Sequence, residues 1–168
     1  MEIKNVVIAG AGVLGSQIAF QAARFGYQVK IWNRHTDRAE RRLAAIKEPF
    51  IKETGSTAAD YQAAMDNIVS ISNDLKATVA DADLVIESVS ESVEIKKAFY
   101  EELCPLLPEK TILTSNSSTF IPSELVGFTD RPDRFAHLHF ANHIWKHNVA
   151  EIVGNPQTKP EVIDDLVA

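Results

Sequence analysis

The sequence NVVIAGAGVLG at residues 5–15 indicates the architecture of the whole chain. Its first five residues are largely β-branched and show no polar alternation, which is typical of a strand covered on both faces, as in a parallel sheet. Apolar residues then recur at helical spacing from Leu14 to Phe25, and Gly26 stands where a left-handed helix stop is expected. Residues 28–32 read as a second strand, so these elements predict a βαβ unit.

The same alternation continues toward the C-terminus. Between residues 36 and about 66 we predict a helical insertion, made of one helix, a break at Pro49 and Thr54–Thr57, and a second helix. Further strands are expected near residues 67–71, 82–86, 111–114, 134–140 and 149–153, with helices near 74–80 and 93–107 and from 160. The sequence therefore predicts one α/β domain over residues 1–168, of the Rossmann type. Its doubly wound, mostly parallel sheet carries helices on both faces and the insertion after its second strand.

Composition excludes several partners. Lys and Arg number 17 against 23 Asp and Glu, for a net charge of −6, and no basic run exceeds two residues, so neither nucleic acid nor an anionic membrane is expected as a partner. The apolar runs are far shorter than the roughly 18 residues of a membrane span, and no signal peptide is recognised. Cys104 is the single cysteine, which favours a reducing, cytoplasmic location.

Residues 10–15 fit the pattern G-x-G-x-x-G between a predicted strand and a predicted helix. Gly10 would permit the tight turn, Gly12 the approach of a pyrophosphate, and Gly15 close packing of the helix on the strand. The backbone at Val13 and Leu14 would present free N–H groups to the anion at the helix N-terminus. The motif predicts a dinucleotide site, with a glycine-rich turn that binds nothing as the alternative.

The end of the second predicted strand bears on the choice of dinucleotide. NAD sites usually carry an acidic residue there for the ribose 2′-hydroxyl, whereas this chain has Asn33, followed by Arg34 and, one turn on, Arg38. An Asn can hydrogen-bond a hydroxyl without repelling a 2′-phosphate, and Arg34 could bind that phosphate or simply be solvated. NAD and NADP both remain open as cofactors at this point.

Polar residues cluster in the second half of the chain. Ser115–Ser118, with Asn116 inside it, follows a buried strand and so should lie at the carboxyl edge of the sheet, where ligands of such folds bind. His137 and His139 share one face of a later strand, and Glu151 lies on the next. A His held by a carboxylate through one ring nitrogen is a general base, although a lone His on a strand is more often structural. No metal site is expected, because neither a cysteine nor a carboxylate completes a ligand set among the histidines.

A resemblance to a known family rests on several motifs in order. They are Gly10–Gly15, the stretch DLVIESVSE at residues 83–91 leading to Lys96, the run SNSS at 115–118, and HFAN at 139–142 leading to Glu151. Together they resemble the NAD-binding domain of the 3-hydroxyacyl-CoA dehydrogenase family over essentially the whole chain. The sequence HFANH followed by Trp145 is most similar to the diketoreductase and 3-hydroxybutyryl-CoA dehydrogenase-like branch.

The resemblance implies an oxidoreductase of fatty acid metabolism that transfers a hydride between NAD(P) and a 3-hydroxyacyl or 3-keto compound. It implies that His139 is the catalytic base and Glu151 its orienting partner, and that Ser118 and Asn142 contact the substrate or help to place the nicotinamide. The positions matching Glu91, Lys96 and Asn116 lie on the cofactor side. Family members continue into a helical domain that completes the substrate pocket and forms the dimer interface, so the longer form is expected to be a homodimer.

Departures from the family pattern keep other functions open. Asn33 replaces an acidic residue, His137 replaces a common glycine, and Ala141 and His143 replace the Phe and Pro of HFFNP. In the family the last two positions border the acyl pocket, so these departures affect the expectation of a CoA thioester substrate and not that of the redox chemistry. One alternative is the 3-hydroxyisobutyrate and 6-phosphogluconate dehydrogenase type, which uses a lysine base. Another is a non-catalytic dinucleotide-binding or crystallin-like protein.

Overall fold

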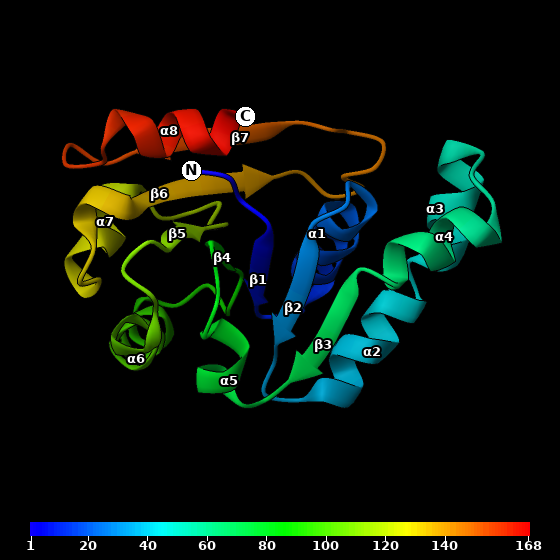
Figure 1. Cartoon of the computed structure of the whole chain (residues 1–168), viewed down its shortest axis with the longest axis horizontal. Coiled ribbons are helices and arrows are strands. Elements are labelled where there is room, and N and C mark those ends of the chain that lie inside the picture. The colour runs from blue at the N-terminus through cyan, green and yellow to red at the C-terminus, as the bar shows by residue number, and fades with distance from the viewer.

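The computed structural model describes residues 1–168 and contains a single seven-stranded sheet (Figure 1). The strands lie in the order β3-β2-β1-β4-β5-β6-β7, and all neighbouring pairs are parallel except β6 and β7. Their bounds are β1 Asn5–Ala9, β2 Gln28–Trp32, β3 Ile68–Ser72, β4 Leu84–Glu87, β5 Ile112–Ser115, β6 Phe135–Phe140 and β7 Ala150–Gly154. Because the chain winds outward in both directions from β1, the predicted Rossmann-type fold is confirmed.

Helices cover both faces of this sheet and form two cores. One core joins the strands to α1, to the helices α2, α3 and α4, and to α8, whereas the other joins them to α5, α6 and α7. The helices are α1 Val13–Arg24, α2 Thr36–Ala44, α3 Lys47–Thr54, α4 Ala58–Met65, α5 Leu75–Val79, α6 Val93–Leu103, α7 Pro122–Leu125 and α8 Pro160–Val167, with short 3₁₀ turns at Cys104–Leu106, Val126–Phe128 and Pro132–Arg134. None of them is long and apolar enough to cross a bilayer.

The segment between β2 and β3 contains three helices, not the two that the sequence predicted. Pro49 does not break a helix, because it lies in the first turn of α3, where a missing N–H costs nothing. Gly55 instead ends α3 with a φ of 73°, and Thr57 begins α4 with a capping box that includes Asp60. These helices extend to one side of the sheet beyond β3 (Figure 1).

Candidate active site

The glycine loop links β1 to α1 at the carboxyl end of the central strand. Gly10 has a φ of 102°, and a Cβ there would lie 2.5 Å from the carbonyl oxygen of Ser88. A Cβ on Gly15 would lie 2.0 Å from the carbonyl oxygen of Gly10. The loop therefore requires glycine at both positions, because the start of α1 packs directly against the turn and against the loop after β4.

Gly12 is different, since a Cβ there would meet nothing within 4 Å. It forms the N-cap of α1 without a side-chain cap, and the N–H groups of Gly12, Val13 and Leu14 have no acceptor within the chain. Free N–H groups beside open space at the positive end of a helix are what a pyrophosphate requires. The residues of this loop therefore fit a dinucleotide.

Asn33 follows β2 and lies against the glycine loop. Its Oδ1 accepts a hydrogen bond from the N–H of Ala11 at 3.0 Å, and its Nδ2 donates to the carbonyl of His35 at 2.7 Å. The side-chain amide thus joins the glycine loop to the turn after β2, and the ribose contact predicted for Asn33 stays a prediction. Arg34 is exposed beside it and forms no ion pair.

The pair of His139 and Glu151 forms where β6 meets the antiparallel strand β7. The two residues are directly opposite in the strand register, and His139 Nδ1 lies 3.1 Å from Glu151 Oε2. The His139 side chain keeps 30% of its surface exposed and that of Glu151 71%. With Nδ1 facing the carboxylate, the other ring nitrogen, Nε2, is left for a ligand. The arrangement can hold an imidazole in one tautomer while it exchanges a proton.

The polar run after β5 is tied to the end of β6. Asn116 is buried, and its Oδ1 accepts a hydrogen bond from the N–H of Phe140, the residue after His139. Ser118 is exposed in this run, and Asn142 is exposed in the loop that follows β6. The structure thus links Asn116 to the His139 strand, whereas the side chains of Ser118 and Asn142 form no hydrogen bond within the chain.

A cluster of charged residues, Glu87, Glu91 and Lys96, lies at the carboxyl end of β4. Lys96 Nζ is 2.7 Å from Glu87 Oε1, with 1% and 0% of the two side chains exposed, and 3.2 Å from Glu91 Oε2. Tyr100 and Ser115 donate to the second oxygen of Glu87, at 2.7 and 2.8 Å. Burial, together with the charge of Glu87, raises the pKa of Tyr100 well above its ordinary value, so its hydroxyl remains a donor.

Glu91 connects this cluster to the polar run. Its carboxylate accepts a hydrogen bond from Ser117 and another from the N–H of Thr119 at 3.2 Å. Burial raises the pKa of Glu91, but the bond from Ser117 and the charge of Lys96 outweigh it and hold the pKa below its ordinary value. Glu91 and Lys96, both predicted from the sequence, are therefore brought together. Glu87, Tyr100 and Ser117 were missed, although a carboxylate ending an apolar strand with a Lys nine positions later is a signal for a buried pair.

His137 lies two residues before His139 on the same face of β6 and is only 4% exposed. Its Nε2 has no hydrogen-bond partner within the chain. Burial first, and the charge of Lys96 second, lower the pKa of His137 to about 4. The ring is therefore neutral near pH 7, so it adds no charge next to His139.

The lowered pKa of His137 predicts a pH-dependent stability. The unfolded chain protonates this ring near pH 6.5 and the folded chain only near pH 4, so the unfolded state binds more protons between these values. We expect His137 to reduce the free energy of unfolding by about 2–3 kcal/mol as the pH falls from 7 to 4.5. Urea unfolding of the wild type and of His137→Gln at both pH values measures this. Equal pH dependence in the two proteins would contradict it.

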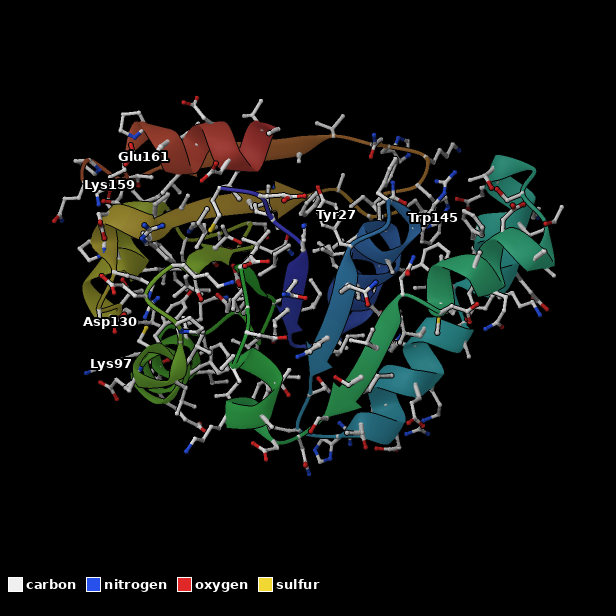
Figure 2. The ribbon with its side chains drawn as sticks, viewed as in Figure 1. Tyr27, Lys97, Asp130, Trp145, Lys159 and Glu161 are labelled. Atoms are coloured by element: carbon white, nitrogen blue, oxygen red, sulfur yellow. The ribbon has the colours of Figure 1, made fainter.

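A second unpredicted cluster joins the insertion to the loop after β6. Glu53 of α3 lies 2.8 Å from His143 Nδ1 and accepts a bond of the same length from the indole N–H of Trp145. The bond to His143 lowers the pKa of Glu53. His143 has a φ of 56°, and its N–H donates to Gln17 of α1. Figure 2 shows Trp145 between α1 and the insertion helices, where it packs on Phe20 and Phe50.

Comparison with known proteins agrees with this geometry. Residues 5–168 match the NAD-binding domain of 3-hydroxyacyl-CoA dehydrogenase. The probable 3-hydroxybutyryl-CoA dehydrogenase of Bacillus subtilis is 32% identical over 170 residues, covering 100% of this chain and 59% of that protein. The mitochondrial hydroxyacyl-coenzyme A dehydrogenase of Sus scrofa is 31% identical over 172 residues, covering 98% of this chain and 55% of that protein. The chain thus spans little more than half the length of these relatives.

Solved structures similar to this chain include enzymes of the same kind. A diketoreductase, described for substrate-directed dual catalysis of dicarbonyl compounds, superposes with a TM-score of 0.94 at 46% identity over 99% of this chain and 60% of that chain. A 3-hydroxybutyryl-CoA dehydrogenase from Escherichia coli K12 gives 0.86 at 30% identity over 99% of this chain and 35% of that chain. The resemblance inferred from the motifs is confirmed, and the matched domain of the family is described as NAD-binding, in agreement with NAD as the cofactor that the resemblance implies. The chain belongs to the 3-hydroxyacyl-CoA dehydrogenase family and corresponds to its NAD-binding domain.

Proposed function

We propose that the protein is an oxidoreductase that interconverts a 3-hydroxyacyl compound and its 3-keto form. The observation that carries this proposal is the pairing of His139 with Glu151 at the end of β6, in a chain whose glycine loop fits a dinucleotide. The names of the relatives support the substrate class. The alternative of a lysine-based dehydrogenase is disfavoured, because the pair at the end of β6 offers a histidine as the base, whereas Lys96 is buried in ion pairs with Glu87 and Glu91.

In this reaction His139 transfers a proton to and from the 3-oxygen of the substrate and hydrogen-bonds that oxygen. During oxidation Nε2 accepts the proton of the 3-hydroxyl group as the C3–H bond breaks and the carbonyl forms. A nicotinamide dinucleotide held at the glycine loop would supply the acceptor for the hydride that leaves C3. Glu151 accepts a hydrogen bond from Nδ1 and stabilises the imidazolium that forms. In reduction the imidazolium returns the proton to the oxygen.

The remaining predicted residues support these steps. Ser118 and Asn142 are exposed beside the His139 strand, so we propose that they hydrogen-bond the substrate oxygen or orient the nicotinamide. Glu91 and Lys96 would lie toward the cofactor, with Lys96 fixing the carboxylate of Glu91. Asn116 positions the end of β6 through its bond to Phe140 and thereby the direction of the imidazole.

A second candidate substrate class is a free dicarbonyl compound. The diketoreductase is more similar to this chain than the B. subtilis relative is, at 46% against 32% identity. Ala141 and His143 also depart from the family pattern at positions that follow His139. A dicarbonyl substrate would undergo the same proton and hydride transfer at one carbonyl.

A substrate panel tests both candidates. We expect the longest natural form of the protein to oxidise NADH or NADPH with acetoacetyl-CoA or with a free β-keto ester. The ratio of the two kcat/KM values decides between the CoA-linked and the dicarbonyl class. Consumption of reduced nicotinamide is followed by absorbance. A protein that binds the dinucleotide but reduces neither substrate would overturn the proposal and favour a non-catalytic binding protein.

We further propose that residues 1–168 form the dinucleotide-binding domain, with a helical insertion at about residues 36–66, of a homodimer whose substrate pocket a second, helical domain completes. The length of the relatives beyond the matched segment supports this. Sedimentation of the longest natural form tests the dimer. A cytoplasmic location is proposed from the single cysteine, Cys104, which is buried and whose pKa burial raises to about 11. Relatives named as mitochondrial make cell fractionation the appropriate test.

A further inference from the structure

The turn between β2 and α2 carries uncompensated positive charge. Arg34 directly follows Asn33, and Arg38 lies in the first turns of α2. Both side chains are exposed, and neither forms an ion pair or a hydrogen bond within the chain. The acidic residue of this turn, Asp37, is already bound by Arg41, whose Nη2 lies 2.6 Å from Asp37 Oδ2. Glu40, further along α2, is exposed and forms no ion pair with either arginine.

Asn33 occupies the place where a carboxylate would otherwise discriminate between nucleotides. Its amide is used on both sides, by the N–H of Ala11 and by the carbonyl of His35. It thereby fixes the turn against the glycine loop without adding negative charge. A carboxylate at this place binds the ribose 2′-hydroxyl and repels a 2′-phosphate, whereas a nearby arginine accommodates that phosphate.

From this arrangement we infer that the β2–α2 turn is a binding site for a phosphate on the 2′ position of the adenosine ribose, with Arg34 and Arg38 as its cations. The protein accordingly binds NADP(H) at least as tightly as NAD(H). A guanidinium forms short, charge-assisted, bidentate bonds to phosphate, and both groups are free to form them. The inference rests on the proposed function only through the dinucleotide site and does not depend on the reaction or its substrate.

Equilibrium binding of two redox-inactive probes tests the inference. ADP-ribose and 2′-phospho-ADP-ribose are titrated calorimetrically into the 168-residue chain, and they differ only in the phosphate of interest. We expect the phosphorylated probe to bind at least as tightly as the other. Arg34→Ala should weaken the phosphorylated probe by about tenfold, Arg38→Ala should weaken it by a smaller factor, and neither should change the affinity for ADP-ribose by more than about twofold.

Two further variants distinguish a specific phosphate site from a general effect of charge. Lys52→Ala removes another exposed, unpaired cation from α3 and should leave both affinities unchanged, which controls for net charge. Asn33→Asp should weaken the phosphorylated probe by at least about tenfold, because the added charge repels the phosphate while Oδ1 can still accept from Ala11. Asp cannot donate to the carbonyl of His35, so the affinity of the same variant for ADP-ribose reports any disturbance of the turn.

The outcomes separate the inference from the proposed function. Weaker binding of the phosphorylated probe than of ADP-ribose, or an Arg34→Ala effect no larger than that of Lys52→Ala, overturns the 2′-phosphate site and leaves the dinucleotide site intact. Failure of both probes to bind the folded wild type overturns the 2′-phosphate site and the dinucleotide site together.

Discussion

His139→Gln should lower kcat for the proposed oxidation by about 10²–10⁴-fold, the range that a positioned acid–base group contributes. Gln has no nitrogen that can accept a proton at neutral pH, so the 3-hydroxyl proton loses its acceptor. The affinity for ADP-ribose should stay within about twofold, because the glycine loop makes no bond to His139. Steady-state kinetics on the longest natural form, with calorimetric titration of the same variant, measures both quantities.

Two comparison variants define the role of His139. Glu151→Gln should also lower kcat by about 10²-fold or more, because the amide no longer fixes the tautomer or stabilises the imidazolium. His147→Gln is the matched control, since His147 is an exposed histidine in the loop after β6 and forms no hydrogen bond through its ring. Full activity of His139→Gln would show that this imidazole is not the proton acceptor. Joint loss of activity and ADP-ribose binding would point to a structural defect instead.

Lys96→Met should reduce the free energy of unfolding by about 3–5 kcal/mol, the cost of leaving a buried charge without its partner. Glu87 is fully buried and would keep its bonds from Tyr100 and Ser115, but its carboxylate would lose the only cation within reach. Urea denaturation at pH 7 measures the change. The neighbouring Lys97 is exposed and lies 4.0 Å from Glu101, so Lys97→Met should change the stability by less than about 0.5 kcal/mol.

A double variant tests the reason for this loss. Glu87→Gln combined with Lys96→Met removes both charges, so it should be more stable than Lys96→Met alone, although the amide satisfies fewer donors. If Lys96→Met unfolds at the same urea concentration as the wild type, the pair does not stabilise the fold. If the double variant is less stable than either single variant, hydrogen bonding and not charge compensation dominates the cluster.

The predictable parts of the fold are those that local sequence encodes. The β-branched run at residues 5–9, the glycines and the helical periodicity after them lie next to one another in the chain, and their pattern predicts the βαβ unit directly. The insertion was predicted less well, because Pro49 is compatible with the first turn of a helix as well as with a break. There the local signal has two physical meanings, and packing of α3 on the core selects one of them.

The features of the candidate site that could not be predicted from the sequence are contacts between residues far apart in the chain. The pairing of His139 with Glu151 was predicted from their places on two successive strands and from the family resemblance, and the structure shows that these strands are adjacent and antiparallel. The contacts of Glu53 with His143 and Trp145 join residues more than 89 positions apart, and no pattern in either segment indicates them. Asn33 was predicted as a ribose contact from its position, but its bond to Ala11 depends on how the glycine loop approaches β2.

The bonds from Glu53 to His143 and Trp145 have a consequence for engineering substrate scope. They couple α3 to the loop that carries Asn142, so a residue change in that helix will alter the shape of a loop to which it is not joined in sequence. Positions 53, 143 and 145 should accordingly be randomised together in a library. A single change at position 53 leaves His143 and Trp145 without their hydrogen-bond partner, and a single change at 143 or 145 removes one partner of the Glu53 carboxylate. Survivors of such a library are expected to carry compensating combinations at these positions.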